Sequence, residues 1–530
     1  MRTLATVAVV VSTLGVQVPS SPPAARPSDT ITRQELRDHV YFLASDFLGG
    51  RRPDDSGFTV AAEYAACQFK AAGVRPAMTD AEGTPTYFQK VYLTQRTTRV
   101  DKPFTLKTPA GEQAFAPLDD LKLVSAGPSL TDVPMVFVGY GISEPDYGWD
   151  DIKDISLKGK VAVMLIGTPQ RDGKPVLPDA IDKKYQSIVG LGRKASNPRL
   201  RENIPAALVV IADKEHAEAW DRLSTIAGET QLRYRPGPAP GRITVPPAAV
   251  ALVKGARAAA IFADQEYDPT GIASKGLAGY RTFALKDVSL SLGLGVTGKD
   301  LESMNVVGVV PGTDPNVANQ YVSVGAHLDH IPPGGSQIRN GADDNASGCA
   351  GVIEIAEAVA LQPLRRPVLF CLWTAEESGL LGSRHFISAP PVPMDRVTVN
   401  INLDSIGRSD AASAKTRTHY VVGSAQVTPE LKALIASVNA RTVKWPLDFE
   451  SQEDSMRGSD HFSFHGLGIP TAFFFSGRPE TLHAPTDDPE TVDYEKVQRI
   501  SQLAYEVAAE LSNRDTSIRP PAGPVKQPMP

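Results

Sequence analysis

The 530-residue chain has few cysteines, little net charge and no long apolar run. Cys67, Cys349 and Cys371 are an odd number in apolar surroundings, which favours buried thiols over a disulfide framework. A net charge of -6 gives no electrostatic footprint for nucleic acid. No run approaches the roughly eighteen apolar residues that a membrane-spanning helix needs, so stable membrane insertion of the mature chain is not expected.

The first residues have the order of an export signal. Arg2 precedes a mostly apolar stretch from Leu4 to Val18, and a segment rich in Pro, Ser and Ala follows to about Arg26. This order is typical of a signal peptide that is removed on maturation, so residues 1–26 are assigned to one. The sequence therefore predicts a secreted or periplasmic protein, with an uncleaved anchor or a misassigned start as alternatives.

Three short apolar runs, at 322–324, 368–372 and 399–401, are predicted to be buried strands that lead into potential metal ligands. In an open α/β sheet, ligands bind outside the carboxyl ends of the strands. Histidines and acids at those ends are therefore expected to gather at one site. The patches concerned are Ala326-His327-Leu328-Asp329, Gly341-Ala342-Asp343-Asp344-Asn345, Ala375-Glu376-Glu377-Ser378, Asn402-Leu403-Asp404 and Leu482-His483-Ala484.

Two histidines and three carboxylates have the composition of a two-metal hydrolase site. If one carboxylate bridges, each of two ions has about three protein ligands and room for a shared water. Imidazole and carboxylate without a thiolate cluster suit zinc, cobalt or manganese. Single motifs also have purely structural alternatives. The Glu376-Glu377 pair could complement a helix dipole, and Asp343 to Ser347 could be no more than an N-cap for the helix expected around Ile353 to Ala360. The presence of all five in order favours the site.

The chain resembles the M28 family of zinc aminopeptidases and carboxypeptidases over most of its length. Six segments in matching order carry the likeness: GAHLDH, GADDNASG, TAEESGLLGS, NLDSIG, SDHFSFHGLGIP and LHAPTDD. The resemblance implies an α/β fold with a mixed, mostly parallel central sheet flanked by helices, and an inserted β-rich protease-associated domain. It further implies two zinc ions per chain and peptide substrates with a free N-terminus.

The resemblance also implies roles for individual residues. The ligands of one zinc would be His327, Asp343 and Asp404, and those of the other Asp343, Glu377 and His483, so that Asp343 bridges. Glu376 would be the general base that takes a proton from a water shared by the ions and hands it to the departing amine. Asp329 would hold the imidazole of His327, and Asp344 would follow a cis peptide bond.

Other histidines and loop residues near these motifs receive weaker assignments. The extra imidazoles are expected to be structural, namely His330, His461 and His465. Met456 stands where some relatives place a tyrosine that donates to the oxyanion, so Arg457 or another residue would have to supply that donor.

The family resemblance leaves several reactions open. The predicted site has no assignable arginine for a substrate carboxylate, which favours an aminopeptidase that removes N-terminal residues. The alternatives are a glutamate-type carboxypeptidase or a glutaminyl cyclase of the same fold, or a non-catalytic binding protein. Every ligand position is filled, which argues against the last. Side-chain preference, oligomeric state and physiological metal are left open.

The rest of the chain divides by its character. Residues 29–117 are expected to form the N-terminal part of the peptidase domain, with two helices between Ile31 and Ala72. Residues 118–290 turn to short strands and loops and resemble the inserted protease-associated domain. Residues 295–512 hold the catalytic domain, and the Pro-rich, polar residues 513–530 are expected to be a disordered tail.

Overall fold

The computed structural model describes residues 26–116, 119–186, 194, 198–212, 220, 230–237, 248–269, 271, 277–331, 337–423 and 428–519. The predicted signal peptide therefore lies, except for Arg26, outside the described residues. The chain forms two compact units. The first contains residues up to 89, 305–373 and 386 onward; the second contains 90–304 and 374–385. Both expected limits of the insert, 118 and 290, fall inside the second unit, and its assignment as a protease-associated domain stays a prediction.

The first unit is built on a mostly parallel sheet of strand order β21-β20-β22-β19-β17-β18-β16. β17 pairs in parallel with β18 and β19, and β19 with β22, whereas β20 and the end of β16 run antiparallel to their neighbours β22 and β18. The strands are β16 (Phe283–Val310), β17 (Tyr321–His327), β18 (Val368–Trp373), β19 (Val397–Asp404), β20 (His419–Val422), β21 (Leu447–Asp448) and β22 (Thr471–Phe475). Nearly all residues of β17, β18, β19 and β22 are buried, as parallel strands covered on both faces require.

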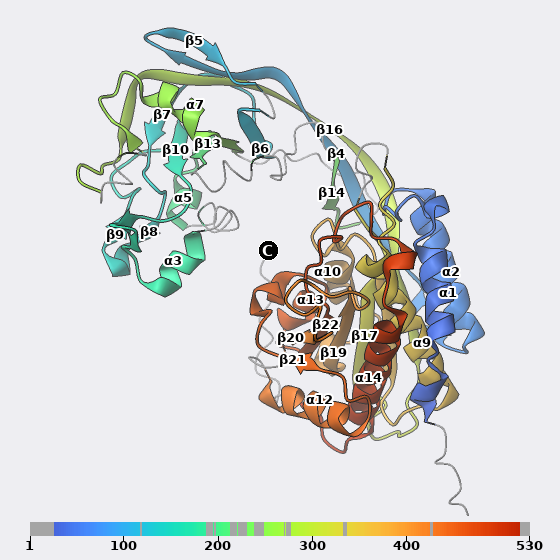
Figure 1. Cartoon of the computed structure of the whole chain (residues 1–530). Helices are drawn as coiled ribbons and strands as arrows, with labels where there is room; N and C mark the ends of the chain where they lie inside the picture. The colour runs from blue at the N-terminus through green and yellow to red at the C-terminus, as the bar shows by residue number, and fades with distance from the viewer. Residues whose placement is uncertain are drawn as a thin grey trace, which may run out of the picture. The chain divides into compact units, whose positions relative to one another are not determined.

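Helices cover both faces of this sheet (Figure 1). On one face, α9 (Gly348–Leu361) and α14 (Tyr494–Asn513) contact the strands, while α1 (Arg33–Leu43) packs on both and α2 (Ser56–Ala71) packs on α9. On the other face, Trp373 contacts Phe386 of α10 (Leu381–Ser388) and Phe464 of α13 (His461–His465). The predicted α/β fold with a mixed, mostly parallel sheet flanked by helices is confirmed.

Local sequence explains where the N-terminal helices begin and which side they bury. Thr32 accepts a hydrogen bond from the backbone of Glu35, and Asp55 from the backbone of Phe58, so each helix has a side-chain N-cap. Leu36, Val40 and Leu43 recur at helical spacing in α1 and are buried. The two helices expected between residues 31 and 72 are therefore present.

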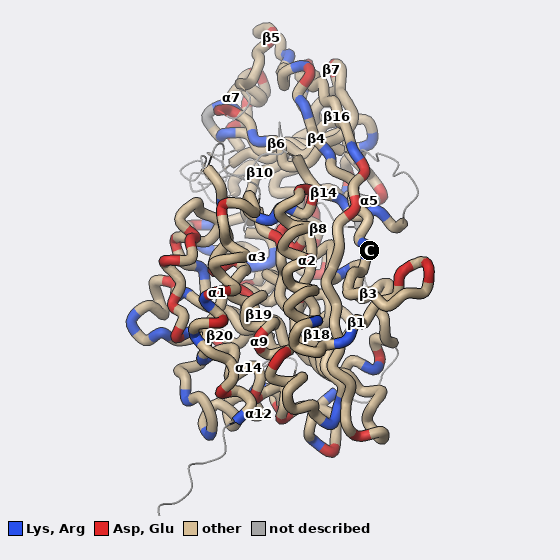
Figure 2. Tube along the Cα trace, turned by 90° about the vertical axis from the view of Figure 1, so that its right-hand side faces the viewer, with Lys and Arg blue, Asp and Glu red and all other residues tan. Residues whose placement is uncertain are grey.

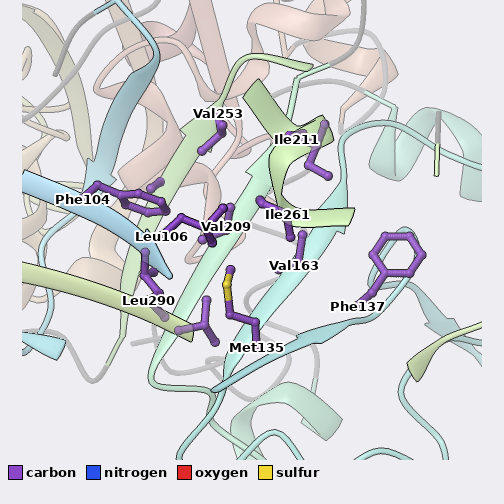
Figure 3. Close-up of a cluster of buried hydrophobic side chains, with 14 of the residues drawn as sticks. Phe104, Leu106, Met135, Phe137, Val163, Val209, Ile211, Val253, Ile261 and Leu290 are labelled. Atoms are coloured by element: carbon purple, nitrogen blue, oxygen red, sulfur yellow. The ribbon is translucent and has the colours of Figure 1, made fainter. Parts of the chain in front are cut away.

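The second unit has its own parallel sheet with an apolar layer on each face. β7 (Leu130–Phe137), β10 (Val161–Leu165), β13 (Ala207–Ile211) and β15 (Ala249–Val253) run parallel in that order, and β6 (Leu121–Ser125) closes the sheet antiparallel to β15. Alternate residues of these strands point to opposite faces, so Val163 and Val209 join one layer, shown in Figure 3, and Ala162 and Leu208 the other.

Two long strands, β4 (Phe88–Thr108) and β16, run from the first unit into the second, and β14 (Thr230–Tyr234) pairs antiparallel with β4. The other helices are α3 (Asp179–Tyr185), α5 (Pro198–Glu202), α7 (Gly255–Phe262) and α12 (Pro429–Arg441). The short strands are β1 (Arg75–Pro76), β2 (Met78–Thr79), β3 (Pro85–Thr86), β5 (Gly111–Ala114), β8 (Ser143–Glu144), β9 (Trp149–Asp150), β11 (Gln170–Arg171) and β12 (Lys174–Pro175).

Two expectations need correction. The disordered tail cannot begin at 513, because Ile518 is buried and the Arg519 guanidinium donates to the carbonyls of Met394 and Val397; only residues 520–530 lie outside the described part. Among the three thiols, Cys67 is exposed, while Cys349 and Cys371 are buried as predicted.

The charged residues carry no single dominant sign. Lys and Arg are interspersed with Asp and Glu along the trace in Figure 2. Within the described ranges, no helix combines the length and the apolar character required to cross a membrane.

Candidate metal centre

The carboxyl ends of β17 and β19 bring His327 and Asp404 together. The two strands pair in parallel with Gly325 opposite Asn402, so both chains leave the sheet at the same edge. Nε2 of His327 lies 3.4 Å from Oδ1 of Asp404, and both side chains are buried. The predicted convergence of these two residues at the strand ends is therefore observed.

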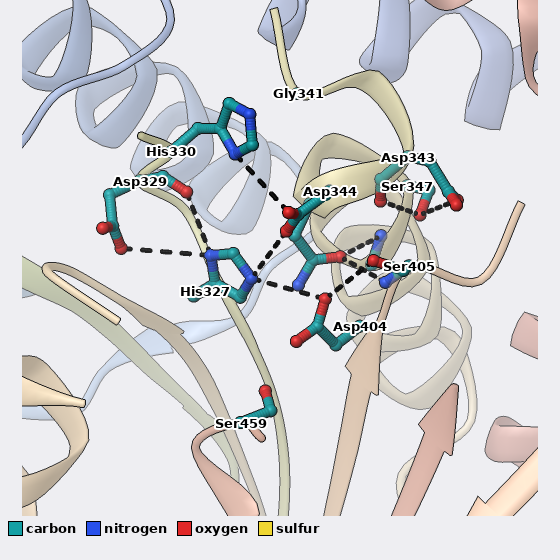
Figure 4. A network of polar contacts seen from close by, with 12 residues as sticks. His327, Asp329, His330, Gly341, Asp343, Asp344, Ser347, Asp404, Ser405 and Ser459 are labelled. Carbon is teal, nitrogen blue, oxygen red and sulfur yellow. Dashed lines mark hydrogen bonds and ion pairs between the residues drawn. The ribbon is translucent and has the colours of Figure 1, made fainter. Parts of the chain in front are cut away.

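Asp344, on the short π-helical turn η5 (Ala342–Ser347), completes the cluster. Its Oδ1 lies 3.2 Å from Nε2 of His327, and its Oδ2 lies 3.1 Å from Nε2 of His483. One carboxylate oxygen therefore faces each histidine. The ligand atoms of His327, Asp344 and Asp404 all lie within 4.8 Å of one another, and Figure 4 shows these side chains turned toward a common point.

Asp343, the expected bridge, points away from this cluster (Figure 4). Its Oδ1 accepts hydrogen bonds from the backbone N–H of Gly407 at 2.6 Å and from Ser347 Oγ at 3.2 Å. The expectation was wrong by one residue, since Asp344 stands between the two histidines. The cis peptide shows the same offset: it joins Asp344 to Asn345, so Asp344 precedes the cis bond and does not follow it.

The backbone path explains this correction. Gly341 has φ 58°, and the turn that follows it presents two adjacent carboxylates to different sides. Which of the two faces the strand ends depends on that path. The letters Asp-Asp in the sequence carry no signal that distinguishes them.

Asp487 fixes the backbone of this turn by hydrogen bonds. Its carboxylate accepts the N–H of Asp343 at 3.0 Å and the N–H of Asp344 at 3.0 Å, and it lies 3.3 Å from the guanidinium of Arg408. The carbonyl of Arg408 in turn accepts a hydrogen bond from the buried Lys496. Asp487 lies in the segment LHAPTDD, from which the sequence predicted a role for His483 alone.

The pKa values of the two adjacent buried aspartates are shifted in opposite directions. Burial raises the pKa of Asp343, and the negative charge of Asp487 adds to the increase. Burial also acts to raise the pKa of Asp344, but His330 and the hydrogen bonds from His327 and His483 outweigh it and hold that pKa well below its usual range. The carboxylate that faces the histidines is therefore the one held ionised.

Main-chain groups fix the loops beside His327. Its Nδ1 bonds to the backbone carbonyl of Asp329 at 2.9 Å, while the nearer carboxylate oxygen of Asp329 is 4.0 Å away. An imidazole that donates through Nδ1 presents the lone pair of Nε2 to the cluster. Asp329 thus orients His327 through its carbonyl. The buried Arg51 donates to the carbonyls of Leu328 and Gly341, which ties the His327 and Asp344 loops together.

Glu376 and Glu377 follow β18 by one turn. Trp373, the last residue of β18, is opposite His327 in the parallel ladder. Glu376 is three residues farther along, so its Cα atom lies at most about 10 Å from that of Trp373. Glu376 is buried and Glu377 half-buried, and the carbonyl of Glu376 accepts hydrogen bonds from the backbone of Gly379 and Leu380.

The extra histidines differ in their surroundings. Nδ1 of His330 lies 3.7 Å from Oδ2 of Asp344. His330, which was expected to be only structural, therefore lines the cluster. His461 is buried and stacks on Phe473 with ring centroids 4.3 Å apart, and burial lowers its pKa to about 3. His465 lies 6.1 Å from the ring of Phe462.

The loop before His461 holds the two residues considered for the oxyanion. Met456 packs against an apolar cluster that includes Phe473 and Phe475. The guanidinium of Arg457 lies 5.2 Å from the ring centre of Phe462. The role of Arg457 as a donor to an oxyanion stays a prediction.

Comparison with known families bears on the same stretch of chain. The family model described as Peptidase family M28 matches residues 305–508, which contain all seven predicted site residues. We call residues 305–508 the M28 domain, because they are the part of the chain that this family model matches. Aminopeptidase YwaD of Bacillus subtilis (strain 168) is 30% identical over 210 residues, which cover 38% of this chain and 43% of that protein. Leupeptin-inactivating enzyme 1 of Streptomyces exfoliatus is 32% identical over 186 residues, covering 34% and 37%.

The chain spans less than half the length of either relative. Among solved structures, the aminopeptidase from Aneurinibacillus sp. strain AM-1 superposes with a TM-score of 0.56 at 18% identity, covering 94% of this chain and 98% of that one. At that identity the likeness shows a shared fold.

Proposed function

We propose that this chain is a zinc-dependent aminopeptidase, in which the M28 domain hydrolyses the peptide bond next to a free N-terminus. The observation that carries the proposal is Asp344, whose two carboxylate oxygens lie 3.2 Å and 3.1 Å from the imidazoles of His327, at the end of β17, and of His483, in the loop after β22. A relative named an aminopeptidase, 30% identical over 210 residues, supports it.

The donor set fits zinc. The buried imidazole of His327, the exposed imidazole of His483 and the buried carboxylates beside them are the ligand types of a catalytic zinc site. His327 and Asp404 would hold one ion, His483 and Glu377 a second, and Asp344 both. When bound, zinc would polarise the scissile carbonyl and lower the pKa of a water.

Glu376 is proposed as the group that moves protons. It is a buried carboxyl one turn after β18 and adjacent to Glu377. It would accept a proton from the attacking water and return it to the departing amine, a role that carboxylates near neutral pH perform when their surroundings are apolar.

Charge around the cluster favours an amine over a carboxylate at the end of the substrate. Two arginines beside the Asp344 turn are committed to the protein: Arg51 donates to backbone carbonyls, and Arg408 pairs with Asp487. A substrate carboxylate would need a free bidentate cation. Carboxylates at the same edge suit a protonated N-terminus, which separates an aminopeptidase from a glutamate-type carboxypeptidase.

A hydrolysis panel tests the proposal. Zinc-loaded wild type and Glu376→Gln would be given aminoacyl-nitroanilides, N-acetylated peptides, and peptides ending in glutamate. We expect cleavage of free N-termini only, and a fall in kcat of roughly 10²- to 10⁴-fold in Glu376→Gln with zinc content unchanged. Glu357→Gln on α9 is the matched control. Cleavage from the carboxyl end, or cyclisation of an N-terminal glutamine, would contradict the proposal.

A further inference from the structure

The turn that carries Glu376 and Glu377 has an unfavourable backbone at each end. Ala375 has φ 53° and Leu380 has φ 61°, in the left-handed region that side chains other than glycine rarely adopt. Such values persist only where the surroundings fix them. Backbone hydrogen bonds close the turn, from Leu381 to Ala375 at 3.0 Å and from Gly382 to Thr374 at 2.9 Å. These hydrogen bonds join residues of the turn to one another, so they do not fix the turn against the rest of the protein.

Apolar side chains from the second unit cover both ends of this turn. Val91 and Leu93 of β4 and Leu232 of β14 form a buried cluster with Ala375 and Leu381. Ala375 directly precedes Glu376, and Leu381 follows the turn. The cluster therefore packs against Ala375 and Leu381, the residues on either side of the two glutamates.

The strand register shows that one face of the β4–β14 ladder makes these contacts. Tyr234 is opposite Leu93 and Leu232 is opposite Gln95, so these side chains share a face. Tyr92 lies between Val91 and Leu93 in sequence and therefore points to the other face, where its ring is stacked by Arg235. The ladder thus offers a contacting face and a non-contacting face for comparison.

Two polar contacts anchor the ends of the same segment. At its start, the hydroxyls of Ser303 on β16 and Thr374 are hydrogen-bonded at 2.6 Å in a buried position. Toward its end, the hydroxyl of Tyr234 bonds to Nδ1 of His385 at 3.0 Å. Three strands that are far from Glu376 in sequence therefore hold the segment 374–385 from its first residue to its last.

We propose that one face of β4 and β14, with Ser303 of β16, is a positioning element for the Glu376 turn, so that the second unit holds the proposed base in place. Leu232 and Tyr234 are its positioning residues, acting through Ala375, Leu381 and His385. The inference rests on the proposed function of Glu376 as the base.

The experiment compares variants of the two faces in the full chain. Leu232→Ala removes packing on the turn, and Tyr234→Phe removes only the bond to His385. Tyr92→Phe is the matched tyrosine control on the opposite face. Leu123→Ala on β6, in the buried layer of the same unit but outside β4, β14 and β16, is the control for general destabilisation. Each variant is measured for kcat, KM, melting temperature, and hydrogen–deuterium exchange of residues 374–385.

We expect Leu232→Ala to lower kcat at least about 10-fold and Tyr234→Phe about 3-fold, with KM within about 2-fold of wild type. Exchange in 374–385 should rise in both, and Tyr92→Phe should match wild type. Leu123→Ala should lower the melting temperature without raising exchange in 374–385 selectively.

Three results would overturn the inference. Unchanged exchange in 374–385 in Leu232→Ala would show that the strands do not hold the turn. Raised exchange with unchanged kcat would show that holding it does not serve catalysis. Equal losses of kcat in Leu232→Ala and Leu123→Ala would reduce the effect to general stability. The exchange measurement needs no activity, so it decides the first point even if full activity of Glu376→Gln refutes the proposed function.

Discussion

At the scale of single residues, the choice between Asp343 and Asp344 decides what the site can hold. Asp344 faces two imidazoles, whereas Asp343 accepts hydrogen bonds from Gly407 and Ser347. We predict that Asp344→Asn weakens zinc binding by more than about 100-fold, because it removes a ligand charge, and that Asp343→Asn weakens it by about 10-fold at most. Competition with a chromophoric chelator measures both. Weaker binding in Asp343→Asn than in Asp344→Asn would restore the original assignment.

A second residue, Asp151 in the second unit, makes stability depend on pH. Burial raises its pKa to about 6, although it accepts hydrogen bonds from Tyr280 and from the backbone of Tyr140 and Ile142. Its pKa is higher folded than unfolded, so the folded state binds more protons between about pH 4 and 6. Stability therefore falls as pH rises through that window, by up to about 3 kcal/mol, and stays at the lower value above it.

Urea unfolding of wild type and Asp151→Asn at pH 4 and pH 7 measures this effect. The free energy of unfolding of wild type should fall relative to that of Asp151→Asn between the two values. Asp150→Asn, at the neighbouring carboxyl that pairs with Arg199, should follow wild type. Parallel pH profiles for wild type and Asp151→Asn would contradict the prediction.

At the scale of elements, Arg51 joins the N-terminal segment to the site. It follows η2 (Asp46–Leu48) and donates to the carbonyls of Leu43, Leu328, Asn340 and Gly341, at 2.5 to 3.0 Å. A lysine cannot reproduce the guanidinium fork, so some of these buried carbonyls would lose their donor.

We therefore expect Arg51→Lys to lower the free energy of unfolding by about 2 to 4 kcal/mol in urea titrations. Arg52→Lys is the control, since Arg52 is partly exposed and pairs with Asp54. Equal stability of the two variants would show that Arg51 does not join these loops.

Strands and helices were predictable where the apolar pattern is strong. Val322, Val368 and Val399 mark strands that are nearly all buried, and Leu36 and Val40 mark a helix with one buried face. Those patterns repeat within a few residues, so a local reading finds them.

Contacts between distant residues were not predictable in the same way. Asp487 binds the backbone of Asp343, 144 residues away, and Arg51 binds the carbonyl of Gly341, 290 residues away. Neither pairing leaves a trace in the neighbouring sequence. The segment after Asn513 shows the same limit: its Pro-rich composition indicated disorder, yet Arg519 donates to Met394 and Val397.

At the scale of the whole molecule, the sequence indicated two parts but not how the chain is shared between them. The second unit begins at Lys90, whereas the composition of the sequence changes only near residue 118. β4 crosses the boundary between the units without a change in its strand pattern, so the sequence does not mark that boundary. The segment 374–385, which carries Glu376, groups with the second unit through contacts that no local pattern announces.

The proposed aminopeptidase activity of the intact chain depends on zinc. It can be tested by titrating metal-free full-length protein with zinc while following nitroaniline release from alanyl-, leucyl- and lysyl-nitroanilides. We expect activity to be absent without metal, to rise with added zinc, and to saturate at about two ions per chain. Cleavage that is independent of zinc, or zinc bound at these residues without any cleavage of free N-termini, would contradict the proposal.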